Sequence, residues 1–152
     1  MSVSNPKTET MYQKYGWIIL LALGILLSLT GLAIAGSPGA NMSDFESSTG
    51  ATWVDWSASE PEAAGYILRL ERLIGVGFAG FSLLSTAIVW TGYRQGERRA
   101  WYIMWLFPII LGLAAIVFFV EGAPGLGGFY SVAAFVALLA LVVTYRKFFP
   151  KV

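Results

Sequence analysis

Three charged residues, Arg69, Glu71 and Arg72, stand directly before a long apolar run that begins at Leu73. Arg69 and Arg72 are three positions apart, so a helix places them on one face, whereas Glu71 points elsewhere. Glu121 follows another apolar run. Charged side chains beside apolar surroundings are costly and are usually paired or functional. We therefore expect either an ion pair between one Arg and Glu121 or another acid, or a site where both Arg residues hold an anionic headgroup or a small carboxylate.

Most other reactive chemistry is excluded by composition, because the chain has no His and no Cys. This excludes thiol nucleophiles, disulfides, Ser-His-Asp triads and zinc sites built from thiolate or imidazole. No two acidic residues fall inside an apolar run. A single carboxylate such as Glu62, Glu71 or Glu121 lacks the partner that acid–base catalysis on a lipid requires. We expect no catalytic residue, no metal and no cofactor, and we expect that the chain is not an enzyme.

The elements that carry these residues are four apolar runs. Charged residues make up only 12% of the 152-residue chain and hydrophobic residues 57%, whereas a soluble domain carries about 25% charged residues. Each run is close to the ~20 residues with which a helix crosses a ~30 Å hydrocarbon core. The sequence therefore predicts an all-α, polytopic membrane protein, a four-transmembrane-helix bundle that forms a single domain over residues 1–152. The predicted spans are residues 17–36, 73–93, 101–120 and 129–145.

The charges of the connections predict the orientation of this bundle. The connection 37–64 has five acidic residues and no Lys or Arg. Because Lys and Arg mark cytoplasmic segments, we expect both termini in the cytoplasm and the protein in the cell (plasma) membrane. The net charge of +1 gives no basic field, so nucleic acid is not an expected partner. The basic residues that decide the orientation are Lys7, Lys14, Arg94, Arg98, Arg99, Arg146, Lys147 and Lys151.

Small residues recur at helical spacing in the first two spans, and we expect them to allow close helix packing. The second span contains a Gly-x-Gly-x-x-Gly pattern at residues 75–80. No strand precedes it, so a dinucleotide site is not expected, and Gly75 and Ala79 are better explained by packing. In the first span the small residues are Gly24, Ser28, Gly31 and Ala35.

The outer connection contains two Trp residues, Trp53 and Trp56, among Ser, Gly and acidic residues. A solvated linker rarely has two Trp residues. We expect this segment either to lie on the membrane surface or to pack over the helix ends, and we take the two Trp residues as a candidate partner-contact surface. The same connection holds the N-glycosylation triplet that begins at Asn41.

Two local signals set the limits of the second and third helices. Ser59 is expected to be an N-cap with Pro61 in the first turn, so the second helix should run from about residue 60 to residue 93. Pro108 lies within the third span, where it should kink the helix.

The segment Tyr93–Trp105, followed by Pro108, resembles a turn seen in small uncharacterised four-helix membrane proteins that are similar to the broad DoxX-like group. The resemblance covers Arg69–Val120. It implies a four-helix bundle. The redox associations of that group would need other residues here, because the chain has no Cys or His to carry them.

These observations favour a non-catalytic integral membrane subunit or scaffold of a larger membrane complex. The expected partners are membrane lipids, together with other membrane proteins or further copies of the chain, because small-residue faces suit close helix packing. The alternative is a protein that binds or transports a lipid or small anion at the outer site formed by Arg69 and Arg72.

Overall fold

Four long helices account for most of the described chain. The structure, a computed structural model, describes residues 11–40 and 42–149. Its elements in this part are helices, without a strand. Lys7, Asn41 and Lys151 lie outside the described residues. The elements are α1 (Met11–Gly36), α2 (Ser43–Thr49), α3 (Trp53–Ser59), α4 (Pro61–Ile88), the π-helical turn η1 (Val89–Tyr93), α5 (Arg98–Met104), α6 (Leu106–Val120) and α7 (Pro124–Phe148).

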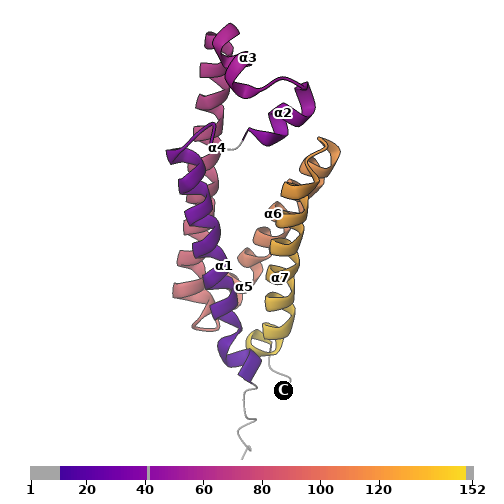
Figure 1. Cartoon of the computed structure of the whole chain (residues 1–152). Helices are drawn as coiled ribbons and strands as arrows, with labels where there is room; N and C mark the ends of the chain where they lie inside the picture. The colour runs from indigo at the N-terminus through magenta and orange to yellow at the C-terminus, as the bar shows by residue number, and fades with distance from the viewer. Residues whose placement is uncertain (1–10, 41, 150–152) are drawn as a thin grey trace, which may run out of the picture.

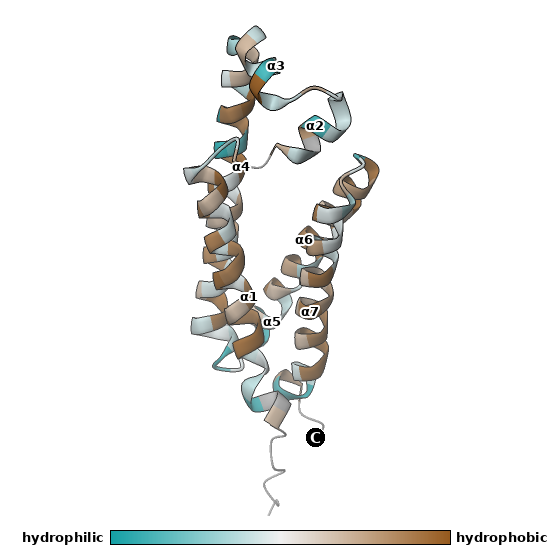
Figure 2. Ribbon diagram, viewed as in Figure 1, coloured by the Kyte–Doolittle hydropathy of each residue, from teal (hydrophilic) through white to brown (hydrophobic). Residues whose placement is uncertain are grey.

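Four stretches of the described residues are long and apolar enough to cross a membrane, which confirms the predicted number of candidate spans. Large apolar side chains are exposed along their length, as a helix surrounded by lipid requires, and Figure 2 shows apolar residues recurring along the long helices. The four stretches are Lys14–Gly36, Pro61–Tyr93, Arg98–Val120 and Pro124–Phe148.

The helices α1 and α7 extend beyond their apolar runs, because a helix can continue past the edge of the hydrocarbon layer. The α1 helix begins at Met11, and α7 continues to Phe148. One predicted cap is wrong. Ser59 is the last residue of α3, where its Oγ donates to the Trp56 carbonyl (2.9 Å), and Glu60 is the N-cap of α4 without a side-chain cap bond. Pro61 does occupy the first turn of α4, as predicted.

Small residues bring α1 and α4 into backbone contact; close packing at these residues was predicted, whereas the pairing of these two helices was not. A Cβ atom at Gly31 would lie 2.6 Å from the backbone nitrogen of Ala79 and 2.8 Å from the carbonyl oxygen of Gly75. A Cβ atom at Gly75 would lie 2.6 Å from the backbone nitrogen of Ala35. Only glycine permits this separation, so these residues set how closely the first hairpin, α1–α4, is packed.

The third span is interrupted where Pro108 was predicted to kink it. The α5 helix ends at Met104 and α6 begins at Leu106, with Trp105 in a turn between them. Proline has no N–H, so the Met104 carbonyl loses its usual partner four residues on. At the same place the Trp105 N–H bonds to the Tyr102 carbonyl, three residues back rather than the usual four (3.2 Å). The helix pair α6–α7 forms the second hairpin.

The two hairpins meet at one end of the molecule and diverge toward the other (Figure 1). The end where they meet is the one where α1 begins and α7 finishes, and the short helices α2 and α3 lie at the opposite end (Figure 1). The shared core joins residues of α1, η1, α5, α6 and α7. Its largest fully buried members include Leu20, Tyr93, Met104, Phe107, Leu111, Leu141 and Phe148.

Candidate functional site

The charged cluster predicted at the start of the second span lies on α4, toward the end opposite the termini. Arg69 and Arg72 are both exposed, and the Arg69 Nε donates to the Gly65 carbonyl of its own helix (3.3 Å). Glu71 is half-buried, and its Oε2 accepts a 2.7 Å hydrogen bond from the Gly39 N–H. Glu71 therefore ties the connection that follows α1 to the side of α4.

Glu121 belongs to the other hairpin, where it is exposed at the C-terminal end of α6. Among the described residues neither Arg69 nor Arg72 forms an ion pair with Glu121. The four residues are thus divided between the two hairpins, with Glu71 bonded to backbone. Anion binding by the two guanidinium groups stays a prediction.

The aromatic residues of the outer connection pack against one another. Phe45 of α2 contacts Trp53 and Trp56 of α3 at ring-centroid distances of 5.1 and 4.9 Å, and the two indoles are 5.5 Å apart. The backbone N–H of Trp53 also donates to the Glu46 carboxylate (2.9 Å). Both Trp side chains are half-buried. Part of each indole remains available at the surface.

This aromatic cluster is held close to the first hairpin. A Cβ atom at Gly39 would lie 2.9 Å from the Leu68 Cδ2 and 3.7 Å from the Trp53 Nε1, so Trp53 lies beside the end of α1 and the side of α4. Thr52 caps α3, because its Oγ1 accepts from the Asp55 N–H (3.2 Å) and donates to the Asp55 carboxylate (2.6 Å). Trp53 therefore packs beside the end of α1, and a position of this segment on the membrane surface stays a prediction.

A buried polar network joins the two hairpins near the termini. The hydroxyls of Tyr93, in η1, and Thr144, in α7, share a hydrogen bond, and both side chains are fully buried. The Thr144 Oγ1 also contacts the Ala140 carbonyl (2.6 Å), and the Trp101 indole N–H donates to the Leu141 carbonyl (3.2 Å). The network fixes α4, α5 and α7 relative to one another.

Basic side chains complete this junction from its polar side. Arg98 Nε donates to the Phe148 carbonyl (3.1 Å), and Lys147 Nζ donates to the Arg94 carbonyl (2.9 Å). These cations bind carbonyls at helix C-termini, where the helix dipole favours positive charge. The Arg94 guanidinium lies 4.6 Å from the ring centroid of Trp90. From the sequence, Arg94, Arg98 and Lys147 were expected to indicate the orientation of the bundle, and no contact of their side chains was predicted.

The junction depends on a π-helical turn that the sequence analysis did not predict. In η1 the Arg94 N–H bonds to the Val89 carbonyl, five residues back (2.9 Å). The extra residue in the turn buries both Gly92 and Tyr93. A Cβ atom at Gly92 would lie 2.9 Å from the Ala100 Cβ, so glycine is needed there. The sequence signal that could have indicated this junction is the hydroxyl of Thr144 in the fourth span, because hydroxyl groups in membrane spans form hydrogen bonds across helices.

The face between the hairpins is filled near the termini and open farther away. On α4, Phe81 stacks on Phe107 (5.7 Å) and Phe78 contacts Tyr130 (5.6 Å). Ile74 is four residues before Phe78 and seven before Phe81, so it lies on the same row. It is nevertheless 66% exposed. Leu126, four residues before Tyr130 on α7, is 37% exposed. The inter-hairpin face thus ends in unpartnered apolar side chains.

The described residues hold no group of three or more Asp or Glu side chains placed to bind a metal ion. What the arrangement offers is a set of surfaces for apolar contact, with a charged and aromatic rim at the end opposite the termini. Compared with protein-family models, with curated proteins and with solved structures, the chain matches none.

Proposed function

We propose that this chain is a non-catalytic integral membrane subunit or scaffold, and that another membrane protein packs against its open inter-hairpin face. The supporting observation is the row formed by Ile74, Phe78 and Phe81. Its two Phe members are packed against the second hairpin, whereas Ile74 is 66% exposed. The hairpins diverge toward this end (Figure 1), and we propose that a partner helix packs against the exposed apolar side chains there.

The rim of this face suits contact with a protein. Trp53 and Trp56 are half-buried at the same end of the molecule, and aromatic residues are enriched where proteins meet. Burial of the rest of each indole by a partner would add apolar contact without exposing the indole N–H to hydrocarbon. We therefore retain these two residues as the candidate partner-contact surface.

The proposed location is the cell membrane, with both termini in the cytoplasm. At the end near the termini lie the basic residues Lys14, Arg94, Arg98, Arg99, Arg146 and Lys147, whereas Glu46, Asp55, Glu60, Glu62 and Glu121 lie at the other end. The positive-inside rule supports this orientation. Membership of a DoxX-like group and anion binding at Arg69 and Arg72 stay predictions.

Photo-crosslinking in native membranes tests the proposed subunit role. Ile74 and Leu73 are neighbours in sequence, are 66% and 68% exposed respectively, and point about 100° apart around α4. A photo-reactive residue at position 74 should crosslink to a second protein and give a band of defined mass. The same residue at position 73 should crosslink to lipid.

A result with only lipid adducts at both positions would overturn the proposal. Crosslinking to protein with equal yield at both positions would overturn the assignment to the inter-hairpin face. Purification in mild detergent gives an independent measurement, because a subunit is retained with its partner and a free-standing protein is not.

A further inference from the structure

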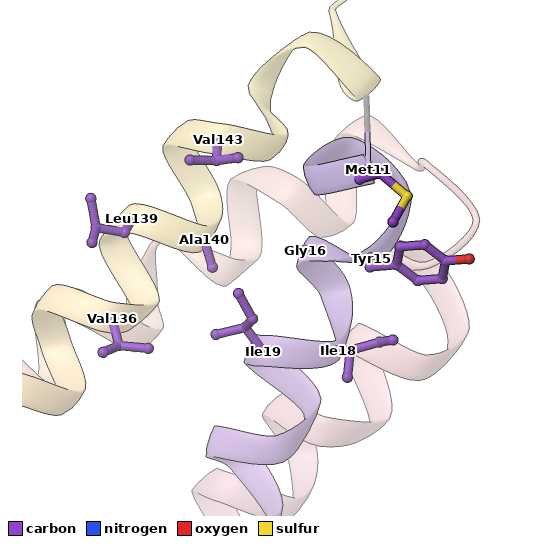
Figure 3. A pocket seen from close by; sticks show the side chains of 9 residues that line it. All are labelled: Met11, Tyr15, Gly16, Ile18, Ile19, Val136, Leu139, Ala140 and Val143. Atoms are coloured by element: carbon purple, nitrogen blue, oxygen red, sulfur yellow. The ribbon is translucent and has the colours of Figure 1, made fainter. Parts of the chain in front are cut away.

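An apolar groove of about 480 Å³ runs between α1 and α7, next to the chain termini (Figure 3). Its walls are aliphatic side chains of both helices, and Met11 and Tyr15 of α1 also belong to the lining (Figure 3). Its volume lies within the ~300–1,000 Å³ range of small-molecule sites. The groove is lined by α1 and α7, and none of its lining residues belongs to the row Ile74, Phe78 and Phe81 of α4. Its other aliphatic walls are Ile18, Ile19, Val136, Leu139 and Val143.

Two small residues explain why the helices leave a groove here. Gly16 and Ala140 line it, and both are buried. Gly16 faces Thr144 so closely that a Cβ at position 16 would overlap its methyl group, which sets the point of closest approach of α1 and α7. Past this contact no larger side chain fills the space between the walls. The shape and apolarity suit a flexible hydrocarbon chain.

Basic side chains flank the groove at its end near the termini. Lys14 lies three residues after Met11 and four before Ile18, which both line the groove, so the helical repeat places it beside the lining face. Its Nζ is 5.3 Å from the ring centroid of Tyr15. Arg146 follows Val143 by three residues and is exposed. An ammonium and a guanidinium thus continue the two apolar walls.

We propose that this groove binds one acyl chain of an anionic phospholipid from the leaflet next to the termini, with the lipid phosphate held by Lys14 and Arg146. The apolar walls account for the chain, and the two cations account for the charge of the headgroup. Arg98 and Lys147 are already bonded to helix carbonyls, whereas Lys14 and Arg146 are exposed beside the groove lining. The proposal does not depend on the subunit role.

Lipid-binding measurements on the purified full chain in nanodiscs test the headgroup contact. With dioleoyl phosphatidylglycerol as probe, the double variant Lys14→Gln, Arg146→Gln should bind on the order of 25-fold more weakly, because each basic residue near an anionic surface contributes about a factor of five. The matched control Lys14→Arg, Arg146→Lys retains both charges at the same positions and should bind like the parent chain. Dioleoyl phosphatidylcholine should bind the parent chain and the double variant equally.

The variant Val143→Trp tests the acyl-chain contact, because it fills the groove from a position that is 45% exposed and leaves both cations in place. It should reduce retention of phosphatidylglycerol at least fivefold, whereas Val142→Trp, from a position 55% exposed on the neighbouring face, should not. Equal losses in the two double variants, equal binding of both lipids by the parent chain, or no effect of Val143→Trp would each overturn the proposal. All these positions except Val143 lie outside the groove lining, and helix content by circular dichroism verifies that each variant is folded.

Discussion

Hydroxyl groups in the spans differ in how they are satisfied, and the differences have energetic consequences. Ser28, Ser85 and Thr86 each donate to the carbonyl four residues back, at 2.7, 2.9 and 2.8 Å. This local bond keeps a hydroxyl satisfied in an apolar environment without a tertiary partner. Thr144 uses the same local bond and also bonds across the hairpins to Tyr93. Ser82 Oγ is buried without a hydrogen-bond partner among the described residues.

Replacement of Ser82 by Ala should leave the protein equally stable or more stable, by up to about 1 kcal/mol. A buried hydroxyl without a partner carries a desolvation cost that alanine removes. Ser85→Ala is the matched control, because Ser85 is also buried but is hydrogen-bonded, so its loss should be neutral or destabilising. Reversible unfolding in mixed micelles gives both values. A Ser82→Ala variant less stable than Ser85→Ala would show that the Ser82 hydroxyl has a partner.

Replacement of Tyr93 by Phe should destabilise the protein by about 0.5–1.5 kcal/mol, the usual range for one hydrogen bond between membrane helices. The ring contact with Phe148, at 4.7 Å between centroids, is retained in this variant. Tyr66→Phe removes a hydroxyl from a side chain that is 60% exposed and should have no effect. In a double-mutant cycle with Thr144→Val, a coupling energy near zero would show that the two hydroxyls do not stabilise the junction.

At the scale of the elements, the distribution of glycine separates close-packed helix faces from lipid-facing ones. Gly31 and Gly75 are in backbone contact across the α1–α4 pair, whereas a Cβ atom at Gly77 or Gly80 would meet no atom within 4 Å. The three glycines of the Gly-x-Gly-x-x-Gly pattern in the second span therefore have different roles. Its first glycine is required by packing, and the other two are not.

Alanine substitution should have opposite effects at these two classes of glycine. Gly31→Ala and Gly75→Ala should each destabilise the protein by about 1–3 kcal/mol, because the added methyl group forces the two backbones apart. Gly77→Ala should stabilise it by about 0.5–1 kcal/mol, because alanine loses less conformational freedom in a helix. Gly80→Ala is a second control, and thermal unfolding of all four variants measures the difference in stability between the two classes. Equal effects at positions 75 and 77 would contradict the close approach of α1 and α4.

Local sequence signals predicted the helices and their small-residue packing faces, whereas contacts between particular distant residues were not predictable. The spans, the small-residue face of α1 and the effect of Pro108 all follow from hydropathy and residue size within one segment. The bond between Tyr93 and Thr144 joins residues 51 positions apart, and it depends on the π-helical turn that positions Tyr93. An ion pair of Arg69 or Arg72 with Glu121 was expected because each of them borders an apolar run, but that position does not determine the lateral separation of two hairpins.

At the scale of the whole molecule, the polar contacts are concentrated at one end. The junction near the termini combines the Tyr93–Thr144 bond, the Trp101 indole bond and the bonds of Arg98 and Lys147 to helix carbonyls. At the other end the hairpins diverge, and α2 and α3 are attached to the first hairpin through Glu71 and the Trp53 cluster. Movement of one hairpin relative to the other therefore requires the least disruption at the end opposite the termini.

The two ends are predicted to lie on opposite sides of the membrane, and the absence of Cys from the chain makes this directly measurable. Ala58 of α3 and Gln95 of the turn between η1 and α5 are both exposed. In intact cells a membrane-impermeant maleimide should label Ala58→Cys, whereas Gln95→Cys should react only after the membrane is opened. The parent chain has no thiol and gives the background. Labelling of Gln95→Cys alone in intact cells would reverse the proposed orientation. Labelling of both variants would show that the two ends share one aqueous compartment, and the four helices would then not cross the bilayer as proposed.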